Sequence, residues 1–178
     1  MMRRAGRICS SDPIRYAVGR RVTHRSMRLS LAPLAEEGDR MKYQFIDITT
    51  IDSGYAGKLS FFEASRDVPF EIKRIYYIHG VPNGARRGGH AHISLRQILF
   101  CPYGKIEIIL DDGHSRESIL LDAPAKGLVI GPRLWREMIW QQENSVLCVA
   151  ASEYYDAKDY IRDYDTFLQD VNEGKFHG

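Results

Sequence analysis

The chain has 178 residues, about the size of one domain, and its 44% hydrophobic and 27% charged residues are ordinary for a globular protein. No stretch approaches the roughly 18 consecutive apolar residues that a membrane-spanning helix needs, so we predict no membrane partner. The formal charge of +2 hides 16 basic and 19 acidic residues after position 40, and this acidic balance argues against a nucleic-acid partner.

Residues 1–40 contain nine arginines, no lysine and four acidic residues, and they show no sustained hydrophobic periodicity. We predict that they form a poorly structured basic extension. The arginine-rich, acid-poor stretch up to Arg28 has the composition of a transit-like segment or a basic arm. The alternative, which we favour, is that translation starts at Met41, because recognisable pattern begins there.

From Met41 onward, short strand-like runs alternate with turn sequences such as Pro82-Asn83-Gly84. Many short strands separated by turns predict an all-β sandwich or barrel. Residues 157–171 have helical periodicity, which predicts one short C-terminal helix. The predicted strands are 45–51, 58–64, 72–79, 90–100, 105–110, 117–121, 127–130, 136–140 and 146–152.

The three cysteines, Cys9, Cys101 and Cys148, have neither a pairing pattern nor the spacing of a metal site. Cys101 and Cys148 lie in apolar strand-like runs, so we expect them to be buried, inert thiols. Unpaired cysteines are typical of a reducing compartment, and we predict a cytoplasmic location.

His90 and His92 are the most informative residues. Because they are one residue apart on a predicted strand, their side chains point to the same face, with backbones roughly 6–7 Å apart. In a small barrel this face is the interior, which can hold one small ligand. Two buried imidazoles need two sets of polar partners, so the pair favours a functional site over two packed core residues.

The run from Gly84 to Gly104 resembles the first motif of the cupin family: glycine, five residues, His-x-His, an acidic position and a closing glycine. The resemblance implies a cupin-type β-barrel, or jelly roll. Gln97 stands where metal-binding cupins carry glutamate, and residues 131–138, which correspond to the second motif, contain no histidine. Glu137 would complete a set of two histidines and one carboxylate, but Arg136 beside it disfavours a cation. We therefore expect no metal and no other cofactor.

Residues 41–171 resemble more closely the metal-free cupins that act as dTDP-4-keto-6-deoxyglucose 3,4-ketoisomerases. The resemblance implies isomerisation of dTDP-4-keto-6-deoxy-D-glucose to the 3-keto sugar, in the biosynthesis of an unusual deoxyamino sugar for a surface polysaccharide or a glycosylated metabolite. It also implies a homodimer with exchanged N-terminal strands and a site at the barrel mouth. The matching segments are RIYYI (74–78), RGGHAH (87–92), LDDG (110–113), KGLVIGP (126–132), WREM (135–138) and ASEYYD (151–156).

This reaction needs a base for the C3 proton, donors for the developing enediolate oxygen and a proton path between O3 and O4. Histidine suits the base, and by the resemblance His90 takes that role while His92 bridges the two oxygens or steadies the enediolate. Strand alternation places Arg74 and Tyr76 on a shared face of the neighbouring strand. The Tyr76 hydroxyl then donates to the oxyanion or relays a proton; the alternative is a packed barrel aromatic.

The substrate also carries a diphosphate and a nucleobase. Guanidinium groups suit phosphate oxygens, so the diphosphate is assigned to an arginine cluster. Trp135 and Tyr55 are the candidates for stacking on the base, with ordinary packing as the alternative for each. Tyr55 and Arg136 are also candidates for setting the product's C4 configuration. The arginine cluster consists of Arg74, Arg86, Arg87 and Arg136.

Three other functions remain open at this stage. A 3,5-epimerase of the same nucleotide sugar also uses a cupin barrel, but that family pairs its histidine base with an aspartate and lacks this His-x-His pair. A metal-dependent cupin dioxygenase would reveal itself by the metal content of the purified protein. A non-catalytic sugar-binding module would not need two ionisable imidazoles in one pocket.

Overall fold

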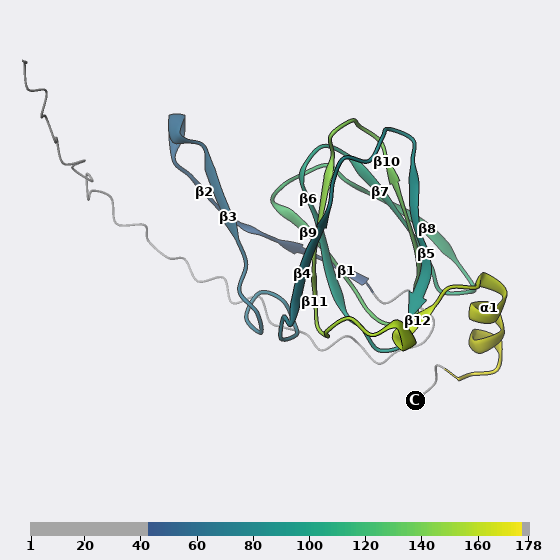
Figure 1. Ribbon diagram of the computed structural model, residues 1–178. Helices are drawn as coiled ribbons and strands as arrows, with labels where there is room; N and C mark the ends of the chain where they lie inside the picture. Colours follow the sequence, from purple (N-terminus) through teal and green to yellow (C-terminus); the bar gives the residue numbers. More distant parts are fainter. Residues whose placement is uncertain (1–42, 176–178) are drawn as a thin grey trace, which may run out of the picture. The chain divides into compact units, whose positions relative to one another are not determined.

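The computed structural model describes residues 43–175, and every prediction made for residues 1–40, Met41 and Cys9 lies outside them. Two five-stranded sheets form the barrel (Figure 1). All strand pairs within the sheets are antiparallel. The all-β prediction is therefore confirmed for this part of the chain.

The first sheet contains the strands in the order β1 (Tyr43–Asp47), β9 (Lys126–Ile130), β6 (Gln97–Tyr103), β11 (Val146–Ala151) and β4 (Arg74–Ile78). The second contains β12 (Tyr160–Ile161), β5 (Arg86–His92), β10 (Trp135–Trp140), β7 (Ile106–Asp111) and β8 (Arg116–Leu121). A separate hairpin pairs β2 (Thr49–Asp52) with β3 (Lys58–Phe61) around the 3-10 turn η1 (Gly54–Ala56).

The core lies between the inward faces of the two sheets. On β7, Ile106, Ile108 and Leu110 are completely buried, and they alternate with partly exposed neighbours as a strand with one buried face requires. They share one cluster with Leu128 of the first sheet and Trp140 of the second. Burial of each such side chain contributes about 1.5–3 kcal/mol, so this two-sided packing is the main term that holds the sheets together.

A β-bulge in β5 sets the position of the histidines. Arg136 of β10 lies opposite His90, whereas the next residue, Glu137, lies opposite Gly88, so Gly89 is the extra residue. Gly88 has φ of +89°, and a Cβ there would lie 2.8 Å from the backbone oxygen of Arg136. Only glycine fits this close approach at Gly88, and at Gly89 the φ of +67° also favours glycine.

Three predicted elements have different bounds in the structure. The run 90–100 is two strands, β5 and β6, because the chain turns after His92 and crosses to the other sheet. The run 45–51 divides at Ile48, where the chain leaves its pairing with β9 and begins the β2–β3 hairpin. The predicted helix at 157–171 starts late: it comprises the 3-10 turn η2 (Ala157–Asp159), then β12, and only then α1 (Tyr164–Asn172).

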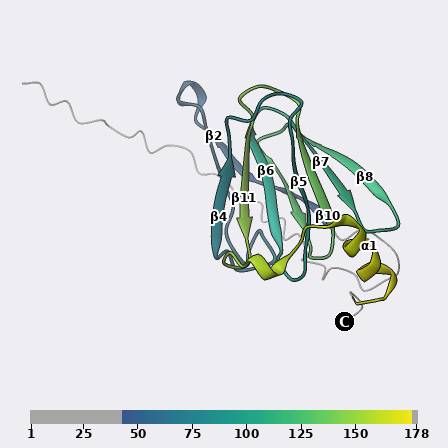
Figure 2. The ribbon, with the colours of Figure 1, turned by 45° about the vertical axis from the view of Figure 1, so that its right-hand side comes forward.

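Helix α1 starts at Tyr164 because the Asp163 carboxylate accepts a hydrogen bond from the backbone N–H of Thr166 and caps it. The helix packs on the barrel beside β5 and β10 through Phe167, which contacts Trp135 (Figure 2). In residues 43–175, no helix is long and apolar enough to cross a membrane.

The two described cysteines are free thiols. Cys101 is buried as expected, and burial raises its pKa to about 11, so it stays a thiol at neutral pH. Cys148 is only half-buried, which corrects the prediction of two fully buried cysteines, although burial still raises its pKa.

Candidate active site

His90 and His92 lie on one face of β5, inside the barrel, as strand alternation predicts. Their ring centroids are 5.0 Å apart, with the rings nearly perpendicular. His92 is 1% exposed, and His90 is half-buried at the edge of a cavity. The two imidazoles are therefore close enough to act on adjacent atoms of one ligand.

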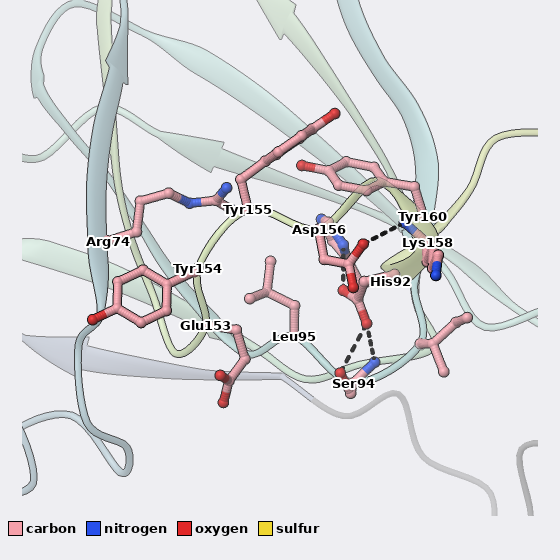
Figure 3. Close-up of a pocket in the computed structure, with 12 residues that line it drawn as sticks. Arg74, His92, Ser94, Leu95, Glu153, Tyr154, Tyr155, Asp156, Lys158 and Tyr160 are labelled. Atoms are coloured by element: carbon pink, nitrogen blue, oxygen red, sulfur yellow. Dashed lines mark hydrogen bonds and ion pairs between the residues drawn. The ribbon is translucent and has the colours of Figure 1, made fainter.

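A cavity of about 560 Å³ opens in front of His90, and a second of about 440 Å³ adjoins His92 (Figure 3). The two cavities share Arg74, Tyr155 and Tyr160 as walls. Together they have the size of a site for one drug-sized or nucleotide-sized ligand. The larger cavity is lined by Arg74, Tyr76, Ile78, Arg87, Gly88, His90, Met138, Tyr155, Tyr160 and Arg162.

Arg74 and Tyr76 do share one face of β4, as predicted, with the Arg74 guanidinium 5.4 Å from the centre of the Tyr76 ring. The strand itself is not a neighbour of β5, which corrects the sequence expectation. It is the edge strand of the first sheet and pairs with β11, so Arg74 and Tyr76 share a cavity with His90 although β4 and β5 belong to different sheets (Figure 1). The pairing of sheets is a long-range property that alternation along a strand does not report.

A buried hydrogen-bond chain orients the Tyr76 hydroxyl. Arg136 donates to the Oε1 atom of Gln97 over 3.3 Å, and the Nε2 atom of Gln97 donates to the Tyr76 oxygen over 2.9 Å. Because a guanidinium can only donate, it fixes the orientation of the Gln97 amide. The Tyr76 oxygen is thus an acceptor towards Gln97, and its own proton is left to point elsewhere. Burial raises the pKa of Tyr76, which keeps that proton in place at neutral pH.

Arg136 is 2% exposed, and its guanidinium also donates to the carbonyl oxygen of Gly131 over 3.5 Å. The side chain is enclosed and lines neither cavity, so this position does not support its predicted place in a diphosphate cluster, which stays a prediction. Its charge acts instead on the histidines. Gln97 stands in the position of the cupin metal ligand, and both ends of its amide are hydrogen-bonded, to Arg136 and to Tyr76.

Both histidines are held in the neutral form. Burial, followed by the charge of Arg136, lowers the pKa of His90 to about 4. The same two causes in the same order, with smaller effects from His90 and Arg74, lower the pKa of His92 to about 2. Each neutral imidazole has a free lone pair at pH 7 with which it can accept a proton, but the lowered pKa makes it a weaker base than an ordinary histidine.

Asp159 holds the His92 ring. Its Oδ2 atom lies 2.9 Å from Nδ1 of His92, and its Oδ1 atom accepts from the backbone N–H and the hydroxyl of Ser94 at 2.9 and 2.8 Å. The Nε2 atom of His92 is buried and has no hydrogen-bond partner among residues 43–175. The sequence did not predict a role for this carboxylate.

Tyr160 and Arg162 were missed for the same reason as Asp159: all three lie in the run predicted to be helical. The pairing of β12 with β5 places Tyr160 opposite His92, with ring centroids 4.3 Å apart for His92 and 5.1 Å for His90. The guanidinium of Arg162 lies 4.2 Å above the Tyr160 ring and lines the larger cavity. The signal available in the sequence was the matched segment 151–156 immediately before them.

Arg86, Trp135 and Tyr55 are not brought to the cavities in the described chain. Arg86 forms an ion pair with Glu137, which also bonds Arg116 and the indole N–H of Trp135. Glu137 is therefore engaged on the opposite face of β10 from Arg136 and does not complete a metal set with the histidines. Residues 43–175 contain no cluster of three or more potential His, Cys, Asp or Glu metal ligands.

The other two aromatics have different surroundings. Trp135 is 6% exposed and packs against α1, with its ring 5.0 Å from that of Tyr164, which supports the alternative of ordinary packing over stacking on a base. Tyr55 is fully exposed in η1, at the tip of the β2–β3 hairpin. Within one chain it is not part of the site.

The fold and the site define a cupin-type barrel whose interior presents two neutral imidazoles, an oriented phenol and several arginines, an arrangement suited to moving protons on a small anionic ligand. The model of the FdtA family (WxcM-like, C-terminal) matches residues 41–172, and the chain belongs to that family.

Several of the relatives that the chain matches are sugar 3,4-ketoisomerases. It is 47% identical over 111 residues, covering 62% of this chain and 80% of the other, to the TDP-4-oxo-6-deoxy-alpha-D-glucose-3,4-oxoisomerase of Aneurinibacillus thermoaerophilus. The structure of QdtA, a sugar 3,4-ketoisomerase of Thermoanaerobacterium thermosaccharolyticum in complex with TDP, matches with a TM-score of 0.71 and 41% identity over 74% of this chain and 95% of that one. A 3,4-ketoisomerase from Helicobacter canadensis matches with a TM-score of 0.72 and 42% identity over 75% and 99%.

Proposed function

We propose that this protein is a nucleotide-sugar 3,4-ketoisomerase that converts dTDP-4-keto-6-deoxy-D-glucose to the 3-keto sugar through an enediol, without a metal. The observation that carries the proposal is the pair of neutral imidazoles facing a cavity lined by Tyr76 and arginines. Family membership supports it, as does the complex of a QdtA variant with TDP-4-keto-6-deoxyglucose. A 3-keto sugar is the form that a transaminase can convert to an amino sugar, which fits a role in deoxyamino sugar biosynthesis in the cytoplasm.

The reaction moves two hydrogens. His90 takes the C3 proton, the electron pair left behind forms the C3–C4 double bond, and the ketone oxygen O4 becomes an enediolate oxygen. The Tyr76 hydroxyl donates to that oxygen, and the buried charge of Arg136 favours its negative charge. His92 carries the O3 proton to O4. A proton then returns to C4 while O3 becomes the ketone, so the product is an isomer of the substrate.

Three arginines on the larger cavity are the proposed diphosphate contacts: Arg74, Arg87 and Arg162. The Nε atom of Arg74 is buried and has no hydrogen-bond partner among the described residues, which fits a donor kept for a ligand. Compared with the sequence-based cluster, Arg162 replaces Arg86, which is paired with Glu137, and Arg136, which is enclosed. Guanidinium forks match phosphate oxygens geometrically.

We also propose a homodimer in which the N-terminal β2–β3 hairpin is exchanged. Every residue of the two strands is exposed, and the hairpin extends away from the barrel in Figure 1. Three apolar side chains of the hairpin are exposed: Ile51 is 50%, Leu59 59% and Phe61 40% accessible to solvent. An isolated two-stranded hairpin is only marginally stable in water, and an exposed apolar patch of this kind is typical of an interaction surface. If the hairpin of one subunit packs on the other subunit, it brings Tyr55, at its tip, to that second subunit. A monomeric mass in solution by light scattering would contradict the exchange.

The activity is tested by incubating the purified protein with dTDP-4-keto-6-deoxyglucose in deuterium oxide and following the sugar by NMR. A ketoisomerase moves the ketone from C4 to C3 and incorporates solvent deuterium at the carbon that receives the proton. A 3,5-epimerase would exchange C3 and C5 while the ketone stays at C4. A sugar-binding module would bind the nucleotide sugar and exchange nothing, and either of these results would overturn the proposal.

A further inference from the structure

Asp159 lines the cavity of about 440 Å³ beside His92, and each hydrogen bond of its carboxylate goes to His92 or to Ser94 in the turn that follows it. We propose that Asp159 is a positioning residue that fixes the tautomer of His92, so that the Nε2 atom is always the proton acceptor. The proposal rests on the proposed isomerase function and adds to it a residue that sequence analysis did not find.

The contacts leave one tautomer. A carboxylate can only accept hydrogen bonds, so the Nδ1 atom of His92, 2.9 Å from Oδ2 of Asp159, must carry the proton. In a neutral ring the proton is then absent from Nε2. That atom is buried without a hydrogen-bond partner among residues 43–175, and His92 borders the cavity of about 440 Å³. The lone pair on Nε2 is therefore available to a ligand, because no residue in 43–175 donates a hydrogen bond to it.

The carboxylate itself cannot turn. Two donors of Ser94, the backbone N–H and the hydroxyl, hold its Oδ1 atom, which leaves only Oδ2 for His92. The backbone is held as well, because the N–H of Ile93 donates to the carbonyl oxygen of Asp159 over 2.9 Å. The next residue, Tyr160, pairs with His92 itself. Asp159, Ser94 and His92 are therefore a rigid unit made by docking β12 on β5.

This arrangement has a chemical consequence for the proton path between the two sugar oxygens. An imidazole whose Nε2 atom starts unprotonated can take the O3 proton and deliver the same proton to O4. The opposite tautomer could only donate first. Asp159 thus sets the order of the proton steps through His92, in the way that the aspartate of a hydrolase triad orients its histidine.

The test is Asp159→Asn. The two Ser94 donors will hold the asparagine oxygen, so the amide NH₂ faces Nδ1 of His92 and forces it to accept. The proton then moves to Nε2. Nitrogen NMR of protein labelled at histidine should show the Nδ1–H tautomer of His92 in the wild type and the Nε2–H tautomer in the variant. Turnover should fall roughly 10²–10⁴-fold while substrate affinity changes by only a few fold.

Asp163→Asn is the matched control. Asp163 lies four residues further along the chain, lines neither cavity, and caps α1 by accepting from the backbone N–H of Thr166, a role that asparagine performs equally well. This variant should keep the His92 tautomer and a turnover within a few fold of the wild type.

The possible results separate the two proposals. If the wild type does not isomerise the nucleotide sugar but the tautomer switches as described, the proposed function fails and the geometry stands. If the wild type isomerises it and Asp159→Asn reverses the tautomer without loss of turnover, the positioning role is wrong. An Nε2–H tautomer in the wild type would overturn it without any variant, even if Asp159→Asn does not fold.

Discussion

Acidification should destabilise the fold through His90, by an amount that the structure allows us to state. The pKa of this imidazole is about 4, against 6.5 for an unperturbed histidine, because of burial and then the charge of Arg136. Between these two values the unfolded chain binds a proton that the folded chain does not. The free energy of unfolding therefore falls as the pH falls from 6.5 to 4. Each pKa unit is worth about 1.4 kcal/mol, so after allowance for partial exposure the loss is about 2–3 kcal/mol.

The measurement is urea unfolding followed by tryptophan fluorescence at several pH values from 7 to 4, for the wild type and for His90→Gln. The variant lacks the titrating group, so its stability should fall less on acidification. The difference between the two proteins isolates His90, because carboxylates and the more deeply buried His92 titrate in both. If the difference between wild type and variant is the same at pH 7 and pH 4, His90 does not have a depressed pKa, and the account of the neutral histidine pair is refuted.

Four further predictions concern the chemistry and the domain. His90→Asn should lower kcat roughly 10²–10⁴-fold and abolish deuterium incorporation, with affinity changed only a few fold, while His92→Asn should be milder on exchange; the reverse pattern would exchange the two roles. Gln97→Glu should lower kcat by roughly 10²-fold, because the carboxylate would accept the Tyr76 proton that is otherwise offered to the enediolate; unchanged kcat would exclude Tyr76 as that donor. Exhaustive chelation should leave activity intact, and activity restored only by added iron, manganese or zinc would contradict the metal-free mechanism. Deletion of residues 1–40 should leave folding and activity unchanged, because the family match begins at residue 41; a protein that no longer folds or dimerises would assign that segment to the domain.

Much of the site follows from local geometry. Side chains two residues apart on a strand share a face whatever the strand pairs with, so the sequence alone was enough to place His90 beside His92 and Arg74 beside Tyr76. The glycine-rich turn and the missing metal ligands around Gln97 likewise lie within short stretches of sequence. The all-β class could be predicted from the same alternation and from the turn residues between strands.

Which distant elements pack against these strand faces could be learned only from the tertiary structure. Burial of Arg136, and its link through Gln97 to Tyr76, depend on how the two sheets close over one another. Asp159 joins His92 because β12 docks on β5 across 67 positions of sequence, in a run whose periodicity had suggested a helix. Periodicity records which side of an element is apolar. It carries no information on which distant element covers that side, because this is settled by packing of the whole barrel.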